Sequence, residues 1–186
     1  MKKSVKLFIF GFLLGIVLSF IFPSLYNLIF GALQERMEAQ SKIVSNPFIG
    51  ILLNNITASF ITAYGGVFLT RLFLFLKSDE KSLKYSLFLF PYSVLLLNGF
   101  ILGVFFNALG IEKFIRGLLP HGVLEIPAIL LSGSIGIEIG EKSLKYIDNR
   151  EKLREKIIFN AKKSIKNYFI VILLLLIAGF LEVSTI

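Results

Sequence analysis

Five long runs of apolar residues divide this chain, and they restrict its fold more than any other feature of the sequence. Each run is close to or above the ~20 residues that an α-helix needs to cross the hydrocarbon core of a bilayer. A soluble domain of 186 residues cannot bury that much apolar surface in one core. The runs predict an all-α membrane protein with one integral membrane domain (1–186), whose five transmembrane helices cover about 7–30, 48–76, 85–109, 118–139 and 167–183.

Lysine and arginine are distributed unevenly between the two sides of these runs. Only four of the 20 lie on the second side, namely Arg36, Lys42, Lys113 and Arg116. Because loops rich in Lys and Arg stay in the cytoplasm, this bias predicts a multi-pass protein of the cell membrane with a cytoplasmic N-terminus and an extracytoplasmic C-terminus. The net charge of +8 then indicates the bilayer as partner, with anionic headgroups at its cytoplasmic face, and no nucleic acid.

The segment 141–166 is the one sizeable stretch predicted to lie outside the membrane. Its apolar residues recur at roughly helical spacing among many charges; they are Leu144, Ile147, Leu153, Ile157, Ala161 and Ile165. The pattern predicts a cytoplasmic amphipathic helix between the fourth and fifth spans, with its apolar stripe in the interface. The segment could be a charged connector that packs on the ends of the other helices, which we favour, or a docking site for a cytoplasmic partner.

Catalytic and cofactor chemistry find little support in the composition. The chain has no cysteine and one histidine, His121, which excludes disulfides, thiolate zinc sites and multi-histidine metal sites. It also lacks GxSxG, HExxH, GxGxxG and Walker motifs. Ser132 and Ser134 lie too far along the same predicted helix from His121 to form a dyad with it. We therefore expect a protein that is not an enzyme, with no catalytic residues, no metal and no cofactor.

Small residues recur every four positions in several of the predicted spans. The pattern runs through Gly11, Gly15 and Ser19; Ala58, Thr62, Gly66 and Thr70; Gly99 and Gly103; and Ala128, Ser132, Gly136 and Gly140, with Gly133 beside the last set. Such faces let two helices approach closely in a membrane, so Gly99, Gly103, Gly133 and Gly136 are assigned to helix packing. Both the interior of the bundle and a homodimer interface fit this pattern.

Polar residues inside the spans form the candidate functional core. They are Asn54, Asn55, Asn98, His121 and Glu125. His121 and Glu125 are four apart and would share one face of a helix that starts near Pro120. Three roles compete: a buried polar cluster that fixes helix register, which we favour; a proton or ion pathway; and a metal site, for which one histidine and one glutamate are too few ligands.

The same positions carry a resemblance to a known family. The chain contains NPFIGILLNNITASFITAYGG, LLLNGFILG and LLPHGVLEIPAILLSGSIGIEIG in its second, third and fourth runs. Over about 46–183 it resembles the stage II sporulation protein M family of integral membrane proteins, which has archaeal and bacterial members. The matching residues are Asn54, Asn55, Asn98, Gly99, Gly103, Pro120, His121, Gly122, Glu125, Gly133 and Gly136.

The resemblance implies a membrane scaffold. The family's namesake gathers peptidoglycan-degrading partners at the septum of sporulating bacteria and is not itself considered a hydrolase. The predicted outer loops, about 31–45 and 110–117, are too short to hold cell-wall enzymes, so the sporulation role is not carried over. Our leading hypothesis is a non-enzymatic scaffold or assembly protein, homo-oligomeric and able to bind other membrane proteins. The alternative is a small-solute or ion transporter or channel that uses the Asn/His/Glu cluster; an intramembrane enzyme ranks last.

Overall fold

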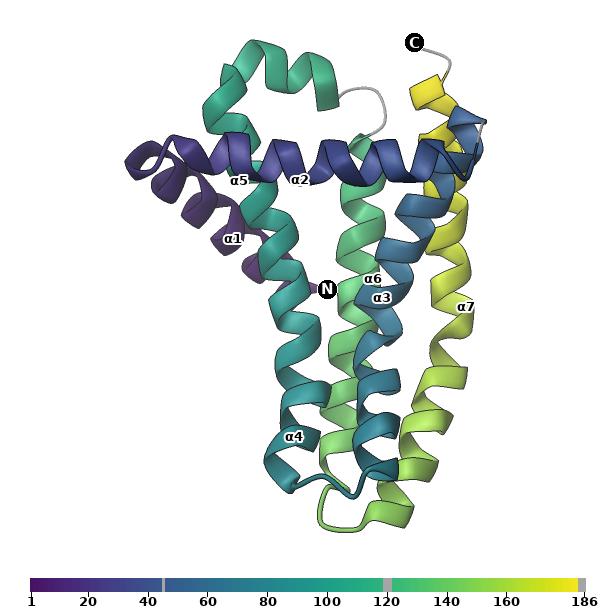
Figure 1. Cartoon of the computed structure of the whole chain (residues 1–186). Coiled ribbons are helices and arrows are strands. Elements are labelled where there is room, and N and C mark those ends of the chain that lie inside the picture. The colour runs from purple at the N-terminus through teal and green to yellow at the C-terminus, as the bar shows by residue number, and fades with distance from the viewer. Residues whose placement is uncertain (45, 119–121, 184–186) are drawn as a thin grey trace.

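The described part of the chain is built from helices. A computed structural model describes residues 1–44, 46–118 and 122–183. Its elements are α1 (Lys2–Ile21), α2 (Ser24–Ser41), α3 (Pro47–Phe75), α4 (Glu80–Lys84), the π-helical turn η1 (Tyr85–Leu89), α5 (Phe90–Leu118), α6 (Gly122–Leu144) and α7 (Arg150–Val183). Figure 1 shows α3, α5, α6 and α7 as a bundle, with α1 crossing α5 and α2 lying across the upper end.

Five helical segments of the described residues are long and apolar enough to cross a membrane. They are Lys2–Ile21, Phe48–Phe75, Glu80–Gly117, Gly122–Leu144 and Arg150–Glu182. Each overlaps one of the five predicted runs. The match is closest for α3, because a side-chain cap and a proline at its first turn mark its start. The Asn46 side chain accepts a hydrogen bond from the backbone N–H of Ile49 at 3.3 Å. Pro47 has no backbone N–H, and none is needed in the first turn, where an N–H has no helical acceptor.

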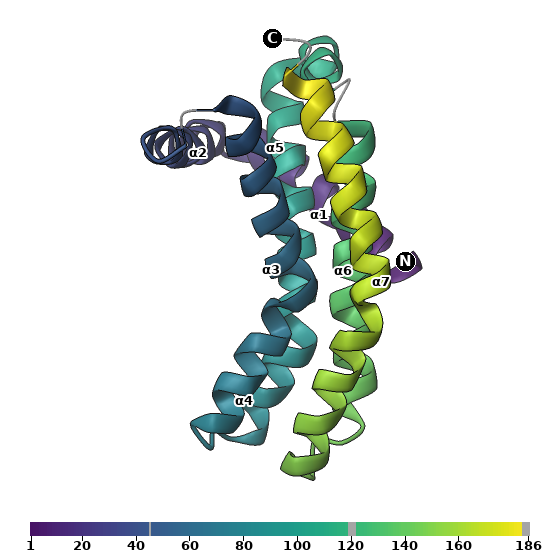
Figure 2. The ribbon, with the colours of Figure 1, turned by 90° about the vertical axis from the view of Figure 1, so that its right-hand side faces the viewer.

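The first predicted run contains two helices. Helix α1 ends at Ile21, because the residue before a proline is sterically driven out of the helical region; Phe22 has φ −124° and ψ 80°. Helix α2 then lies across the bundle, and Figure 2 shows it almost end-on, standing away from the other helices. Its Tyr26 and Phe30 rings pack on Phe105 of α5, at centroid distances of 5.3 and 6.4 Å. The predicted outer loop at 31–45 is therefore largely helical.

Helix α5 changes direction near its end. Gly110 has φ +73°, a backbone conformation that side chains other than glycine rarely adopt. The turn that follows it folds back over the bundle at the upper end of Figure 1. Residues 111–118 therefore do not lengthen the membrane-crossing part of α5.

The segment 141–166 differs from the separate interfacial helix that the pattern predicted. Residues 141–144 complete α6, and α7 begins at Arg150 and continues into the membrane span without a break. Leu153 and Ile157 are fully buried in the same core as Leu83 and Leu175. Leu153 and Ile157 of the apolar stripe thus pack against the bundle, where α3 and η1 cover them, whereas Ile165 is exposed.

Hydrogen bonds fix an antiparallel register between α3 and α7. Tyr168 and Ser59 share a hydroxyl contact of 3.0 Å, and Tyr64 and Ser164 share one of 3.1 Å. Beyond the end of α3, the Arg150 guanidinium donates to the carbonyl oxygen of Ser78 at 2.7 Å. Residues 65–75 of α3 consequently lie beside residues 150–163 of α7, at what we call the basic end of the molecule.

A short capped helix starts the return from the basic end. Asp79 accepts hydrogen bonds from the hydroxyl and the backbone N–H of Ser82, at 2.6 and 3.0 Å, and so caps α4. These donors lower the pKa of Asp79, the hydroxyl having the largest effect.

Candidate functional site

Four glycines let α1 and α5 touch backbone to backbone. Gly11 and Gly15 of α1 lie on Leu96 and Phe100, while Gly99 and Gly103 of α5 lie on Phe8 and Phe12. A Cβ atom added at any of the four would come closer than 3.0 Å to a carbonyl oxygen of the facing helix. The residue numbers rise together, so the two helices run parallel. We call Gly11, Gly15, Gly99 and Gly103 the glycine seam.

A second close approach is built around Pro91. Proline has no N–H, so the carbonyl oxygen of Leu87 loses its usual helical donor four residues on, and the wide turn η1 forms at this point. The Cα of Gly140 on α6 lies against that carbonyl, where a Cβ would clash with the oxygen. The Thr70 and Ser86 hydroxyls contact each other nearby at 2.7 Å. The freed carbonyl thus becomes a packing site for α6.

Gly133 and Gly136 also lie against neighbouring helices. A Cβ at Gly133 would overlap the Leu95 side chain of α5, and one at Gly136 would meet the Thr62 carbonyl oxygen of α3 closer than 3.0 Å. The sequence left open whether the small-residue faces belong to the bundle interior or to a homodimer interface. In the structure these four-residue patterns contact helices of the same chain.

Asn55 and Glu125 form the polar pair of the candidate core. The Asn55 side-chain amide donates to Glu125 Oε1, joining α3 to α6 between residues 70 apart in sequence. Asn54 precedes Asn55, and its Oδ1 is buried with no hydrogen-bond partner in the described part of the chain. A hydrogen bond between side chains of two helices can hold them in register where lipid excludes water.

The remaining predicted core residues are placed differently. The Asn98 side chain donates to the Val94 carbonyl oxygen of its own helix at 2.8 Å, so its amide is used locally on α5. His121 lies outside the described residues, and the predicted pairing of His121 with Glu125 stays a prediction. The described residues contain no group of three or more His, Cys, Asp or Glu side chains that could hold a metal ion.

A polar network at the start of α1 was missed by sequence reasoning. Lys3 Nζ pairs with Glu141 Oε1 at 2.5 Å, and the Tyr92 hydroxyl donates to the same oxygen at 3.1 Å. The Ser4 and Ser134 hydroxyls contact each other at 2.5 Å. These bonds tie α1 to α5 and α6 at the end where its glycine contacts begin. The available signal was weak, because Lys3 and Ser4 are ordinary residues at the edge of a span.

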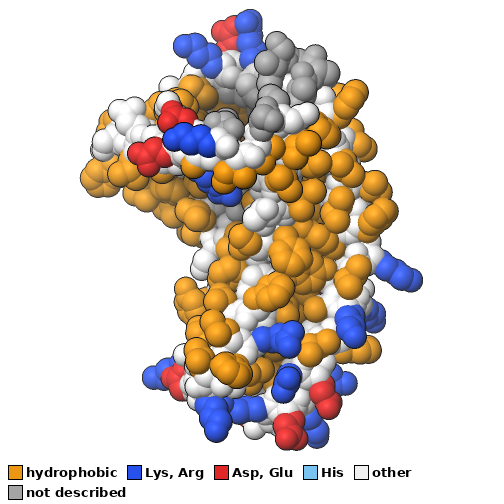
Figure 3. Space-filling view, turned by 45° about the vertical axis from the view of Figure 1, so that its right-hand side comes forward, with side chains coloured by type: hydrophobic (Ala, Val, Ile, Leu, Met, Phe, Trp, Pro, Cys, Tyr) orange, Lys and Arg blue, Asp and Glu red, His pale blue; other side chains and the backbone are white. Residues whose placement is uncertain are grey.

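One side of the basic end is apolar and exposed. Phe68, Leu72 and Phe75 of α3 and Leu76, which follows its last residue, are exposed, and Phe75 is 83% accessible. The register places these four residues, the α3 apolar face, beside the charged first half of α7. Figure 3 shows hydrophobic side chains continuing down to the charged lower end of the molecule. If the membrane boundary lies at the last charged residue of the first half of α7, Lys166, the α3 apolar face lies outside the lipid, on the water side.

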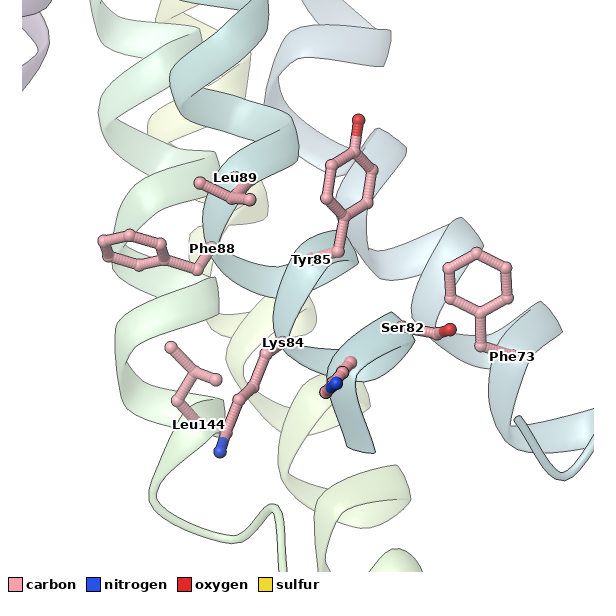
Figure 4. A pocket seen from close by; sticks show the side chains of 8 residues that line it. Phe73, Ser82, Lys84, Tyr85, Phe88, Leu89 and Leu144 are labelled. Atoms are coloured by element: carbon pink, nitrogen blue, oxygen red, sulfur yellow. The ribbon is translucent and has the colours of Figure 1, made fainter. Parts of the chain in front are cut away.

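A broad depression continues the α3 apolar face across the next helix. It encloses about 850 Å³ and is lined by Phe73, Lys81, Ser82, Lys84, Tyr85, Phe88, Leu89 and Leu144. Figure 4 shows Phe73 on the right and Phe88 pointing to the left, with Tyr85 between them and Lys84 pointing down. The lining combines three aromatic side chains with aliphatic ones and exposes few polar atoms.

The chain is similar to one family of membrane proteins and to two archaeal proteins. Residues 4–184 match the family model of stage II sporulation protein M. Uncharacterized protein MJ0706 of Methanocaldococcus jannaschii is 28% identical over 194 residues, covering 97% of this chain and 80% of that protein. Uncharacterized protein MJ0793 of the same organism is 38% identical over 96 residues, covering 48% of this chain and 52% of that protein. No solved structure matches the chain.

Proposed function

The chain belongs to the stage II sporulation protein M family, and from this premise we propose that it is a non-enzymatic membrane scaffold that assembles with further copies of itself. The observation that carries the proposal is the exposed α3 apolar face at the basic end. Exposed apolar surface of this kind marks protein contacts when lipid does not cover it. The depression lined by Phe73, Tyr85 and Phe88, which adjoins this face, would offer other membrane proteins a docking site.

The intramembrane residues support a structural role more than a chemical one. The glycines assigned to helix packing, Gly99, Gly103, Gly133 and Gly136, lie against other helices of the same chain. Thr62, Thr70 and Ser132 donate to carbonyl oxygens four residues earlier on their own helices. Polar groups that are satisfied on their own helices are not free for chemistry.

Self-association should be visible as disulfide cross-linking from the α3 apolar face. Because the chain has no cysteine, Phe75→Cys gives a single reporter thiol on that face. In lipid vesicles under mild oxidation we expect a covalent dimer as the main product, with at least about fivefold less dimer from Phe20→Cys. Phe20 is a matched control, because it is 78% accessible and lies on α1.

Phe75→Glu tests the same surface without a cross-link. A charge placed in an apolar contact is costly, so we expect subunit counting in vesicles to change from oligomers to monomers. A strictly monomeric wild-type chain in lipid, or a Phe75→Glu chain that assembles like wild type, would contradict the proposal.

Transport is the second candidate function, and the Asn55–Glu125 pair favours it. A carboxylate joined to an amide between two spans, beside the buried Asn54 oxygen, provides polar groups that could line a pathway. Solute or ion flux into vesicles that is lost in Glu125→Gln would support transport in place of the scaffold role.

The proposed orientation places the basic end and the N-terminus in the cytoplasm. Single cysteines at Gln34 on α2 and at Lys152 on α7 are exposed at opposite ends of the molecule. On intact cells, a membrane-impermeant maleimide should label Gln34→Cys and should reach Lys152→Cys only after permeabilisation. The reverse labelling would invert the orientation.

A further inference from the structure

A lysine-lined cleft lies between α6 and α7, away from the α3 apolar face. It encloses about 400 Å³, and its lining includes Lys142 of α6 and Lys162, Lys163 and Lys166 of α7. Asn160, Ser164 and Asn167 add polar groups, Glu138 adds one carboxylate, and Ile135 and Ile139 complete the wall. We call it the four-lysine cleft. Two helices therefore bring four cations to one hollow in the surface.

The charges in the cleft are not balanced within the described part of the chain. Glu138 pairs with Lys142 on α6. No acidic side chain of the described residues pairs with Lys162, Lys163 or Lys166, so their three positive charges are available to a bound anion. Grouping like charges on one helical turn is unfavourable unless water or an anion compensates them. The cleft is therefore suited to an anion.

The position of the cleft along α7 indicates what the anion is attached to. The uncharged part of α7 starts at Asn167, directly after Lys166. Ile170, Leu173 and Ile177 follow Lys166 at helical spacing on one face, and all three are exposed. Cations at the end of an exposed apolar stripe match the order of a phospholipid, with its phosphate at the interface and its chain in the hydrocarbon.

We propose that the four-lysine cleft binds the phosphate headgroup of an anionic phospholipid, with one acyl chain lying along Ile170, Leu173 and Ile177. Lys162, Lys163 and Lys166 supply the charge, and the amide of Asn167 supplies a neutral donor at the level of the glycerol. Basic pockets between transmembrane helices recognise anionic headgroups in this manner. The proposal does not depend on self-association of the chain.

Quenching by brominated lipid tests the cleft directly. The chain has no tryptophan, so Phe169→Trp, at an exposed position one turn beyond Lys166, supplies a single fluorophore. The full chain is reconstituted in vesicles of phosphatidylcholine and phosphatidylglycerol, with bromine on one lipid at a time. We expect a preference for phosphatidylglycerol of at least about tenfold, since one lysine near a headgroup is worth roughly fivefold and the cleft holds three that lack an acidic partner.

Charge variants separate the cleft from the general surface field. Replacing Lys162, Lys163 and Lys166 with glutamine in the reporter chain should reduce the preference to about twofold or less. The matched control replaces Lys77, Lys145 and Lys152, which are exposed and outside the cleft, and should stay within about twofold of the parent. Equal loss in both triple variants, or none in the cleft variant, would overturn the proposal.

Two further arms keep the result unambiguous. Quenching by brominated phosphatidylcholine alone should be unchanged in every variant, which verifies insertion; if the triple cleft variant fails this test, Lys163→Gln is used and should lower the preference several-fold. Inorganic phosphate added at constant ionic strength should change the preference by less than about twofold. If phosphate abolishes the preference, the cleft binds a free anion and the lipid proposal is wrong.

Discussion

Gly103→Leu is expected to release α1 from α5 and to lower the free energy of unfolding by about 3 kcal/mol. The carbonyl oxygen of Phe12 occupies the place where a side chain would begin. The facing atoms are backbone, so they cannot rotate away as a flexible side chain would. The two helices must separate, and the contacts along the whole glycine seam are lost with them.

Thermal denaturation in mild detergent measures the loss. For a chain of this length, about 3 kcal/mol corresponds to a Tm lower by roughly 6–12 °C. Gly31→Leu and Gly117→Leu are matched controls, because a Cβ at either position has no atom within 4 Å. We expect both controls to keep Tm within about 2 °C of the parent.

A disulfide reports whether α1 is docked. Ser4 and Ser134 have hydroxyl oxygens 2.5 Å apart, so Ser4→Cys with Ser134→Cys should form an intrachain bond in the parent. In Gly103→Leu we expect the yield to decrease several-fold, because α1 no longer holds Ser4 on α6. An unchanged yield together with an unchanged Tm would show that the seam tolerates a side chain and that the close approach is not needed.

The five helical segments that are long and apolar enough to cross a membrane could be predicted from sequence, because hydropathy and length identify them. Helix α3 was predicted at 48–76 and spans Pro47–Phe75. Helix α2 was not predicted, because its first half, Ser24–Leu33, contains no charged residue and continues the preceding apolar run. Only Pro23 separates the two, and a proline can kink a helix as well as end it.

The candidate site could be predicted only in part. Small-residue spacing identified Gly99 and Gly103 as a packing face, but it could not name α1 as the partner. Polar residues in the spans identified Asn55 and Glu125, which the structure brings together, whereas Asn98 bonds to its own helix. Spacing along one helix says which residues share a face and leaves open which other helix that face meets.

The α3 apolar face could not be predicted from sequence, because it is defined by the register between α3 and α7. Phe68, Leu72 and Phe75 looked like ordinary members of a transmembrane run, because the run is continuous in sequence. Their significance comes from the neighbouring helix, whose charged residues lie at the same height. Hydropathy of one segment cannot reveal such a mismatch, since it compares no two helices.

Leu153→Ala combined with Ile157→Ala is expected to lower the free energy of unfolding by about 6 kcal/mol, because each buried aliphatic truncation costs about 2–5 kcal/mol. Both side chains are 0% exposed in the core formed by α3, η1, α6 and α7. Truncating them leaves a cavity that the surrounding helices can fill only in part. The first half of α7 should therefore detach from the bundle, and its amide protons should exchange faster with solvent.

Ile165→Ala separates this packing from an interfacial amphipathic helix. Ile165 belongs to the same apolar pattern as Leu153 and Ile157 but is 58% exposed in the structure. If the bundle core buries the first half of α7, Ile165→Ala should change the free energy of unfolding by less than about 0.5 kcal/mol. If the stripe lay in the membrane interface, all three truncations would weaken the segment to a similar extent. Equal losses of stability and of exchange protection in 150–166 would therefore favour the interfacial helix over the continuous, core-packed α7.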